Sequence, residues 1–318
     1  MFVSRKVIKG KARYYLEQSV RLSGGNVKKF SVYLKNYRPE KADNLESYTT
    51  LLNQKTETAV LNSAVESYSK DAIFNIGSIS KLEEIKLSYR KLVKKISRKQ
   101  LQDVIDRFAV NFTYESNAIE GNSLTLKDVA IVLQERKAIE GKDLREIYES
   151  LNTREAMELI FSKKLKISVE DIIKLHRILV KDTGVALGYK KLPNFLLGRD
   201  TKITPPEKVA EEMRELIKWY RSSTKMHPLE RAAVFHGRFE RIHPFEDGNG
   251  RVGRLLINIL LISNGYPPLI IRKTYRMSYL SCLEAFDKGY RDRLKRFLIE
   301  KYKATYKKFF EVYIRYLK

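Results

Sequence analysis

The stretch Ile242-His-Pro-Phe-Glu-Asp-Gly-Asn-Gly-Arg-Val-Gly-Arg254 gathers a histidine, two acids, an asparagine and two arginines around three glycines. A strongly apolar run, Leu255-Leu-Ile-Asn-Ile-Leu-Leu-Ile262, follows it. Gly248-Asn-Gly250 predicts a tight turn, because glycine adopts backbone conformations closed to other residues, and the apolar run predicts a buried helix. We therefore expect a loop that delivers charged and amide groups to a helix N-terminus. Unpaired N–H groups and the helix dipole bind anions there.

The composition of the chain indicates a mainly α-helical protein. Glycine (15) and proline (8) are scarce among the 318 residues, which favours helices over a β-sandwich or barrel. The single cysteine, Cys282, excludes an intrachain disulfide, favours a reducing compartment and is expected to be a small buried residue. No apolar run reaches the roughly 18–20 residues that span a bilayer, and residues 1–6 lack the apolar stretch of a signal peptide. We expect a cytoplasmic protein with no membrane partner.

The chain is strongly basic, with 62 Lys and Arg against 38 Asp and Glu and a formal charge of +24. Positive charge is densest in residues 1–41 and 272–318. One interpretation is a nucleic-acid or other acidic partner. The other is that the excess charge only coats the surface of the protein.

Four regions are predicted along the chain. Residues 1–41 show the alternation of a basic three-stranded β-meander, with Phe2–Ile8 as its first strand and a hairpin turn at Ser23-Gly-Gly-Asn26. This meander could bind nucleic acid through Lys, Arg and Tyr, or it could be a target-recognition or packing module. A helical region (42–167), a helical core (168–302) and a C-terminal helical tail (303–318) follow. Apolar periodicity predicts helices at 44–76, 80–113, 125–139, 141–162, 168–182 and 278–316.

Three features outside the motif permit more than one interpretation. In Ser116-Asn-Ala-Ile-Glu-Gly121, Ser116 and Glu120 share a helix face and Gly121 is a plausible helix end. Taken alone, the pattern also fits a solvated glutamate near a helix terminus. Residues 190–204 predict an irregular hairpin, which could be a lid, a substrate-docking edge or a simple connection. His176, embedded in a helical pattern, is expected to be a packed histidine.

His243 admits three interpretations: a metal ligand, a structural histidine and a general base. The chain has four histidines and no H-x-x-x-H pair, which disfavours a metal-hydrolase site. The charged loop around His243 disfavours a structural role on an apolar face. A general base is favoured, because imidazole titrates near neutrality and takes a proton from a hydroxyl.

The neighbours of His243 suit phosphoryl or nucleotidyl transfer. Asp247 offers a carboxylate of the kind that binds Mg²⁺. The turn Gly248-Asn-Gly250 lets backbone N–H groups approach a phosphate closely. Arg251 and Arg254 are three residues apart in the first turns of the helix, and arginine matches phosphate geometry through paired hydrogen bonds.

Residues 243–254 resemble the full Fic motif, H-x-F-x-(D/E)-G-N-(G/K)-R-x-x-R, with no position unmatched. One departure from the family is Lys190, where many members have arginine after Gly-Tyr. The resemblance extends over about residues 168–302 and includes Leu175-His-Arg177, Gly188-Tyr189, Pro205-Pro206, His227-Pro-Leu-Glu230 and Gly265-Tyr-Pro-Pro268.

The resemblance implies a Fic-type helical bundle with a short β-hairpin flap, and a protein adenylyltransferase that moves AMP from ATP to a Ser, Thr or Tyr hydroxyl of a target protein. It makes His243 the catalytic base, Asp247 the Mg²⁺ ligand and Phe245 a buried anchor of the loop. The residues that it implies for ATP binding are Gly248, Asn249, Gly250, Arg251, Arg254, Asn258 and Tyr279. The residues that it implies for aligning the target along the flap are Lys190, Leu192, Phe195 and Leu197.

The segment Ser116–Gly121 resembles the family's inhibitory motif, (S/T)-x-x-x-E-(G/N), in the N-terminal position of class II members. In those proteins the glutamate pairs with the second motif arginine, which would join Glu120 to Arg254 here. Such a pair would occupy the cation meant for the γ-phosphate of ATP, so that ATP would bind unproductively. Ser116 would strengthen the competition by bonding into the phosphate cradle.

Other functions and other partners remain open at this point. The enzyme could use another nucleotide or remove AMP with a water held by Glu120. A basic nucleic-acid-binding regulator could act through residues 1–41. Family members often dimerise, so a homodimer and self-modification stand beside the unidentified target protein as partners.

Overall fold

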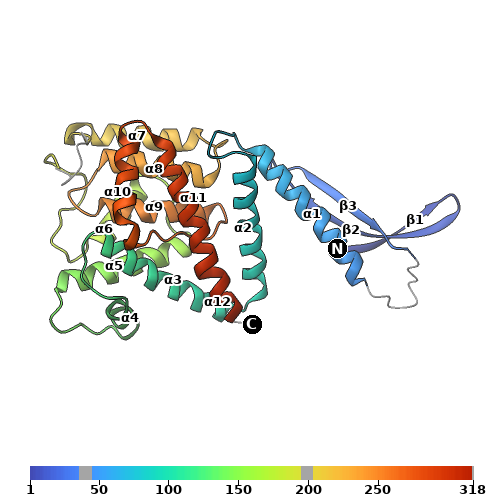
Figure 1. The fold of residues 1–318 in the computed structure, drawn as a ribbon, viewed down its shortest axis with the longest axis horizontal. Coiled ribbons are helices and arrows are strands. Elements are labelled where there is room, and N and C mark those ends of the chain that lie inside the picture. Colours follow the sequence, from blue (N-terminus) through green and yellow to red (C-terminus); the bar gives the residue numbers. More distant parts are fainter. Residues whose placement is uncertain (36–44, 195–202, 317–318) are drawn as a thin grey trace. The chain divides into compact units, whose positions relative to one another are not determined.

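The computed structural model describes residues 1–35, 45–194 and 203–316. They belong to two compact units, Met1–Glu84 and Ile85–Lys318, each with its own packing (Figure 1). None of the helices that the structure describes is long and apolar enough to cross a membrane.

The first unit contains the predicted basic meander and one helix packed on it. Strands β1 (Phe2–Ile8), β2 (Lys11–Arg21) and β3 (Val27–Tyr33) pair antiparallel in the order β1-β2-β3. Helix α1 (Glu46–Ser67) contacts β2 and β3. A three-stranded sheet alone would be marginal, and the contact with α1 gives it a small core of Leu16, Val32, Leu34 and Leu52.

One predicted helix is in fact two. The chain passes from the first unit to the second along α2 (Ile76–Lys95), and α3 (Arg98–Ile119) follows after a break. The prediction of a single helix over 80–113 was wrong because Ser97 caps a new helix. Its side chain accepts a hydrogen bond from the Gln100 N–H, and the Gln100 side chain accepts one from the Ser97 N–H. This capping box is a sequence signal that the continuing apolar periodicity concealed.

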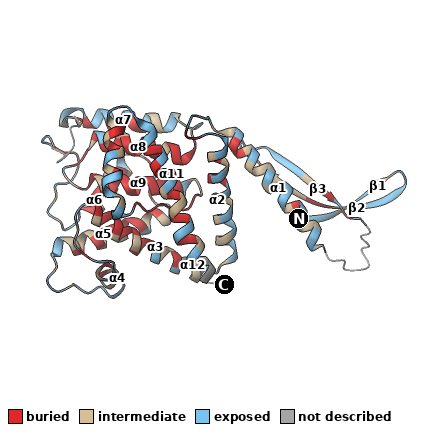
Figure 2. Ribbon diagram, in the orientation of Figure 1, coloured by how far each residue is buried: buried red, intermediate tan, exposed pale blue. Residues whose placement is uncertain are grey.

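The second unit is a helical bundle built around α9 (Asn249–Ser263). Helix α9 is buried along almost its whole length (Figure 2) and contacts α3, α5, α6 and α8. The apolar run after the motif therefore forms the predicted buried helix. The other helices of the unit are α4 (Leu126–Glu135), α5 (Leu144–Phe161), α6 (Val169–Leu179), α7 (Pro206–Ser222), α8 (Pro228–Ile242), α10 (Arg276–Asp287), α11 (Arg291–Thr305) and α12 (Glu311–Tyr316).

The predicted β-hairpin flap lies mostly outside the described residues. Residues 190–194 and 203–205, its two described ends, form no strand. Residues 195–202 are not described, so the hairpin stays a prediction. The described ends are nevertheless fixed near the motif: the Lys190 N–H donates to the Pro244 carbonyl of the motif (2.9 Å), and the Thr204 N–H donates to the Arg241 carbonyl in the last turn of α8 (3.3 Å).

Candidate active site

The motif spans the turn between α8 and α9 (residues 243–248) and the first turns of α9 (residues 249–254). His243 ends α8 in a left-handed conformation (φ 48°), and its N–H donates to the Phe239 carbonyl at 2.9 Å. Gly248, also left-handed (φ 83°), precedes Asn249, the first residue of α9. The left-handed conformation is uncommon for a residue other than glycine. At His243 it turns the chain away from α8 at the position of the predicted base. The loop reaches the N-terminus of a buried helix, as the sequence indicated.

Phe245 anchors this loop in the core. Its side chain is completely buried, and its ring stacks on that of His176 with 3.8 Å between centroids and 6° between planes. The Asn249 side chain fastens the same residue twice: Oδ1 accepts from the Phe245 N–H (2.9 Å) and Nδ2 donates to the Phe245 carbonyl (2.8 Å). Because its amide is engaged by the loop, Asn249 would contribute to phosphate binding through its backbone N–H in the first turn of α9.

His176 on α6 is packed, as predicted, but it also supports the motif. Its Nε2 lies 3.1 Å from the Asp247 carbonyl oxygen. Burial lowers the pKa of His176 to about 4, so the ring is neutral at pH 7. We infer that it donates its one N–H to Asp247, which steadies the loop without placing a positive charge under it. The only sequence signal for this role was the position of His176 within the family-like segment Leu175-His-Arg177.

Lys190 supports the motif from the flap side. The side chain is buried, and Nζ donates to the Ile242 carbonyl at 3.4 Å. Burial lowers the pKa of this amine. The buried side chain therefore supports the motif loop, while the predicted role of Lys190 in aligning a target along the flap stays a prediction. Of the other predicted docking residues, Leu192 is exposed, while Phe195 and Leu197 lie outside the described residues.

His243 is oriented by Glu240. Its Nδ1 lies 3.3 Å from the Glu240 carbonyl oxygen and 3.8 Å from the carboxylate oxygen Oε2. When Nδ1 carries the proton and donates it to Glu240, Nε2 carries the lone pair that a general base requires. The geometry is compatible with the predicted role of His243.

Asp247 lies on the open side of the loop, with its side chain 45% exposed. Its Oδ2 is 2.5 Å from Nη2 of Arg145 and 3.5 Å from Nη2 of Arg251. Within residues 1–35, 45–194 and 203–316, no group of three or more His, Cys, Asp or Glu side chains is placed to hold a metal ion. A single half-exposed carboxylate still fits Mg²⁺, which typically takes one or two carboxylates together with phosphate oxygens and water. Arg145 would have to release Asp247 for such an ion to bind.

Arg254 and Glu120 form the ion pair that the resemblance implied. Nη2 of Arg254 lies 2.7 Å from Glu120 Oε1 and donates to the Ser116 carbonyl at 2.9 Å, while Nε donates to Ser116 Oγ at 3.0 Å. The Arg254 side chain is 2% exposed and that of Glu120 is 42% exposed. Helix α3 ends at Ile119, Glu120 is its C-cap, and Gly121 turns the chain away in a left-handed conformation (φ 103°). The last turn of α3 therefore covers the second motif arginine.

Glu120 also lies against the N-terminus of α9. A Cβ atom at Gly250 would collide with Glu120 Oε1 and would come within 3.0 Å of Arg254 Nη1. Glycine at this position allows the carboxylate to approach the first turn of α9, where unpaired N–H groups and the helix dipole favour an anion. Glu120 thus lies where the sequence predicted a phosphate.

Arg251 is bound by carboxylates as well. Its Nη1 lies 3.1 Å from Oε1 of Glu149 on α5, and its side chain is buried. Glu149 also accepts a hydrogen bond from Asn122 Nδ2 (3.0 Å) and lies 3.4 Å from Nε of Arg145. The sequence did not reveal Arg145 or Glu149. They contact motif residues about a hundred positions later in the chain, and no local pattern indicates such a contact.

Asn258 and Tyr279 lie behind Arg254 and not on the open side of the site. The Asn258 amide is fully buried: Nδ2 donates to the Leu269 carbonyl (3.0 Å) and Oδ1 accepts from the Leu269 N–H (2.8 Å). This corrects the expected contact between Asn258 and a nucleoside, because both ends of the amide hold the chain after α9. Tyr279 is equally buried, with its hydroxyl 2.7 Å from His236 Nε2 and its ring 6.0 Å from the Arg254 guanidinium. Its place is to support Arg254.

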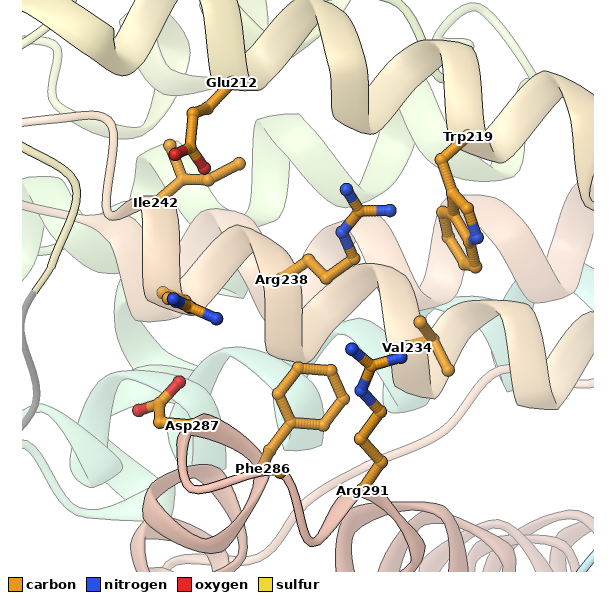
Figure 3. Close-up of a pocket in the computed structure, with 10 residues that line it drawn as sticks. Glu212, Trp219, Val234, Arg238, Ile242, Phe286, Asp287 and Arg291 are labelled. Carbon is orange, nitrogen blue, oxygen red and sulfur yellow. The ribbon is translucent and has the colours of Figure 1, made fainter.

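A separate cavity of about 490 Å³ lies between α7, α8 and the turn from α10 to α11 (Figure 3). Arg238 and Arg291 extend into it, and the Arg238 guanidinium lies 5.2 Å from the Trp219 ring. No residue of the segment 243–254 is among its described lining residues. We therefore do not assign the nucleotide to this cavity.

Known proteins resemble the part of the chain that carries this site. A sequence model of the Fic/DOC family matches residues 166–261. Protein adenylyltransferase fic-1 of Caenorhabditis elegans is 33% identical over 186 residues, which cover 56% of this chain and 36% of the relative. Protein adenylyltransferase Fic of Drosophila virilis is 37% identical over 181 residues, 55% of this chain and 37% of the relative. The chain spans about a third of the length of these curated relatives.

Solved structures share the fold of the helical unit. A Fic-domain-containing signaling protein from Bacteroides thetaiotaomicron matches with a TM-score of 0.66 and 26% identity, covering 74% of this chain and 96% of that one. A fragment of Fic-1 from C. elegans matches with a TM-score of 0.65 and 23% identity, covering 85% and 78%. Residues 166–261 thus match the Fic/DOC family, and the predicted mainly α, Fic-type fold with N-terminal strands is confirmed.

Proposed function

We propose that this chain is a protein adenylyltransferase, which transfers AMP from ATP to a Ser, Thr or Tyr hydroxyl of a target protein, and that Glu120 inhibits it. The observation that carries the proposal is the complete motif 243–254, held on a braced loop at the N-terminus of a buried helix. The curated relatives are named protein adenylyltransferases, which supports this reaction.

The charged residues of the motif and the N-terminus of α9 have separate roles in the proposed reaction. His243 Nε2 accepts the hydroxyl proton while the target oxygen forms a bond to the α-phosphorus of ATP. The bond from this phosphorus to the bridging oxygen breaks, and pyrophosphate leaves. Arg251 and the first N–H groups of α9 bind the phosphates. Asp247 would hold Mg²⁺, which when bound neutralises part of the phosphate charge.

Inhibition follows from competition for one cation. The buried Arg254 is bound by Glu120 at 2.7 Å, and the same guanidinium is proposed to bind the γ-phosphate. ATP can adopt its productive position only when the carboxylate leaves Arg254 and the first turn of α9. Glu120 is 42% exposed, so the carboxylate has solvent available when it leaves.

The proposal is tested by incubating the full chain with Mg²⁺ and α-labelled ATP, in the presence of a lysate of the source cells. We expect Glu120→Gln to raise the incorporation of label into protein by about 5–150-fold, the usual range of coupling between two sites. Glu140→Gln, a change at an exposed glutamate outside the site, is the matched control and should leave incorporation unchanged. The same assay with α-labelled GTP, CTP and UTP establishes the nucleotide, and mass spectrometry identifies the modified proteins.

Two results would contradict the proposal separately. If His243→Ala in the Glu120→Gln background retained full incorporation, the assignment of the base would be wrong. If Glu120→Gln gave no more label than Glu140→Gln, inhibition by Glu120 would be wrong.

A further inference from the structure

The N-terminal sheet has two different faces. On one face, Leu16 and Val32 pack with Leu52 of α1. In an antiparallel pair, residues opposite each other point to the same side of the sheet, and neighbours along a strand alternate. The register pairs Tyr15 with Tyr33 and Ser4, so these residues lie on the face opposite to Leu16. Within its own unit, α1 does not cover this second face.

Aromatic rings gather on the second face. The rings of Tyr15 and Tyr33 lie next to each other, with 5.3 Å between centroids. Tyr33 is 41% exposed, and Phe2, on the same face opposite Glu17, is 53% exposed. Aromatic side chains are usually buried, so a group of exposed rings marks an interaction surface. Their flat faces allow planar groups to stack on them.

Cations lie beside these rings. The Lys6 amine is 4.8 Å from the Tyr15 ring, the Arg13 guanidinium 5.8 Å from the Tyr33 ring, and the Lys29 amine 5.4 Å from the Phe2 ring. By register, Lys11 and Arg21 share this face at its two ends. The second face therefore combines aromatic surfaces with five cationic side chains.

The one acidic residue of the three strands, Glu17, is already paired with lysines. Glu17 is fully buried and pairs with both Lys29 and Lys6, at 2.9 Å from the latter. These two lysines lower the pKa of Glu17 to about 2, so it remains an anion that holds both cations in place. Among the residues of β1, β2 and β3, all of which the structure describes, there is no other Asp or Glu. The face retains a net positive charge.

We propose that this face binds single-stranded nucleic acid. Bases would stack on Tyr15, Tyr33 and Phe2, and phosphates would lie on Arg13, Lys6 and Lys29. Surfaces that combine aromatic rings with cations bind single strands with little sequence preference, since every base has a flat face and every nucleotide a charge. An acidic peptide would use the cations but not the rings, and a duplex hides its base faces, so the exposed rings favour a single strand over both. This inference is independent of AMP transfer.

The test measures binding of the full chain to a fluorescein-labelled 20-mer of dT and of rU by fluorescence anisotropy, between about 50 and 200 mM salt. We expect Tyr15→Ala with Tyr33→Ala to weaken binding by at least about tenfold, and Tyr15→Phe with Tyr33→Phe to retain it because the rings remain. Arg13→Ala should weaken binding and reduce its salt dependence. Arg5→Ala is the matched control: Arg5 is an exposed arginine on the neighbouring strand, paired with Tyr14 on the α1-facing side, and its loss should have a smaller effect.

Each alternative has its own outcome. Equal affinity for the 20-mer and for its duplex, or an Arg5→Ala effect as large as that of Arg13→Ala, would show binding by charge alone and overturn the proposal. Competition by poly-glutamate at equal charge concentration, together with full binding by the double alanine variant, would indicate an acidic protein partner. Circular dichroism of each variant verifies that a loss of binding is not a loss of folding.

Discussion

A glutamate binds cations in each of the two units, and the two arrangements differ in which partner is buried. In the sheet, Glu17 is completely buried while Lys6 and Lys29 are about half exposed (47% and 52%). At the motif, the buried partner is Arg254 (2%), and Glu120 is 42% exposed. Leaving a buried charge without a partner costs several kcal/mol. The buried Glu17 therefore requires its two lysines, whereas the buried Arg254 requires an anion beside it. That anion can be a carboxylate or a phosphate, which makes the second pair exchangeable.

Removing the buried cation should have the largest effect. In the Glu120→Gln background, we expect Arg254→Ala to lower AMP transfer by about 10²–10³-fold, as is typical when a preorganised group that stabilises transition-state charge is lost. Arg254→Lys keeps the charge but not the paired donors and should recover only part of the rate. Steady-state assays with α-labelled ATP measure both. Unchanged rates in Arg254→Ala would mean that this arginine does not bind the nucleotide.

Removing the charge of Glu120 and of Glu17 should have different consequences in the two units. Glu120→Gln should raise AMP transfer by about 5–150-fold with little change in the protection of any strand. Glu17→Gln should leave AMP transfer unchanged and increase amide hydrogen exchange in β2, because two lysines lose their anionic partner. Exchange measured by mass spectrometry together with the activity assay makes the comparison. If Glu17→Gln also activated the enzyme, the contrast between the pairs would be wrong.

Ser116 should modulate the exchangeable pair to a smaller degree. Its hydroxyl accepts from Arg254 Nε at 3.0 Å, a contact that helps to hold Arg254 beside Glu120. Ser116→Ala should raise AMP transfer by about two- to tenfold, which corresponds to the roughly 0.5–1.5 kcal/mol of one net hydrogen bond, because Arg254 keeps its contact with the Ser116 carbonyl. Ser123→Ala, at an exposed serine beyond the helix end that bonds to Glu146, serves as the control. A loss of activity in Ser116→Ala would contradict an inhibitory role.

The smallest effect concerns pH. The pKa of Glu17 is about 2, below its ordinary value of 4.5, because the folded sheet favours the charged form. Its contribution to stability is therefore complete above about pH 4.5 and is lost as the pH falls through 2. A ¹³C NMR titration of the Glu17 carboxyl should give a pKa near 2, and Lys29→Ala should move it toward 4.5. Titration near 4.5 in the unmodified chain would show that the lysines do not hold this carboxylate.

The sequence predicted those parts of the site that depend on neighbouring residues. The loop, the helix after it and the αL glycine at 248 follow from local patterns, and the resemblance added the pairing of Glu120 with Arg254. Arg145 and Glu149 were not predicted, and His176 was predicted only as a packed histidine. All three contact the motif through tertiary packing, which local sequence patterns do not show. Their local sequence is that of ordinary amphipathic helices, in which neither burial nor partner can be read.

Two errors show how local patterns mislead. Apolar periodicity continued across Ser97, where a capping box begins a new helix, because both helices bury the same kind of face. Asn258, polar and two turns beyond Arg251, looked available for a nucleoside. In the structure its amide instead satisfies the backbone of Leu269, as a buried polar side chain inside a core helix must do. A polar residue in an apolar run is therefore a better sign of a backbone partner than of a ligand.

The most direct test of the central claim compares the affinities for ATP and ADP by isothermal titration calorimetry, with Glu120→Gln and the Glu140→Gln control. If Glu120 and the γ-phosphate compete for Arg254, Glu120→Gln should strengthen ATP binding by about tenfold or more and change ADP binding much less. The preference for ATP over ADP would then rise in this variant alone. An equal gain for ATP and ADP, or no gain for either, would contradict competition for Arg254.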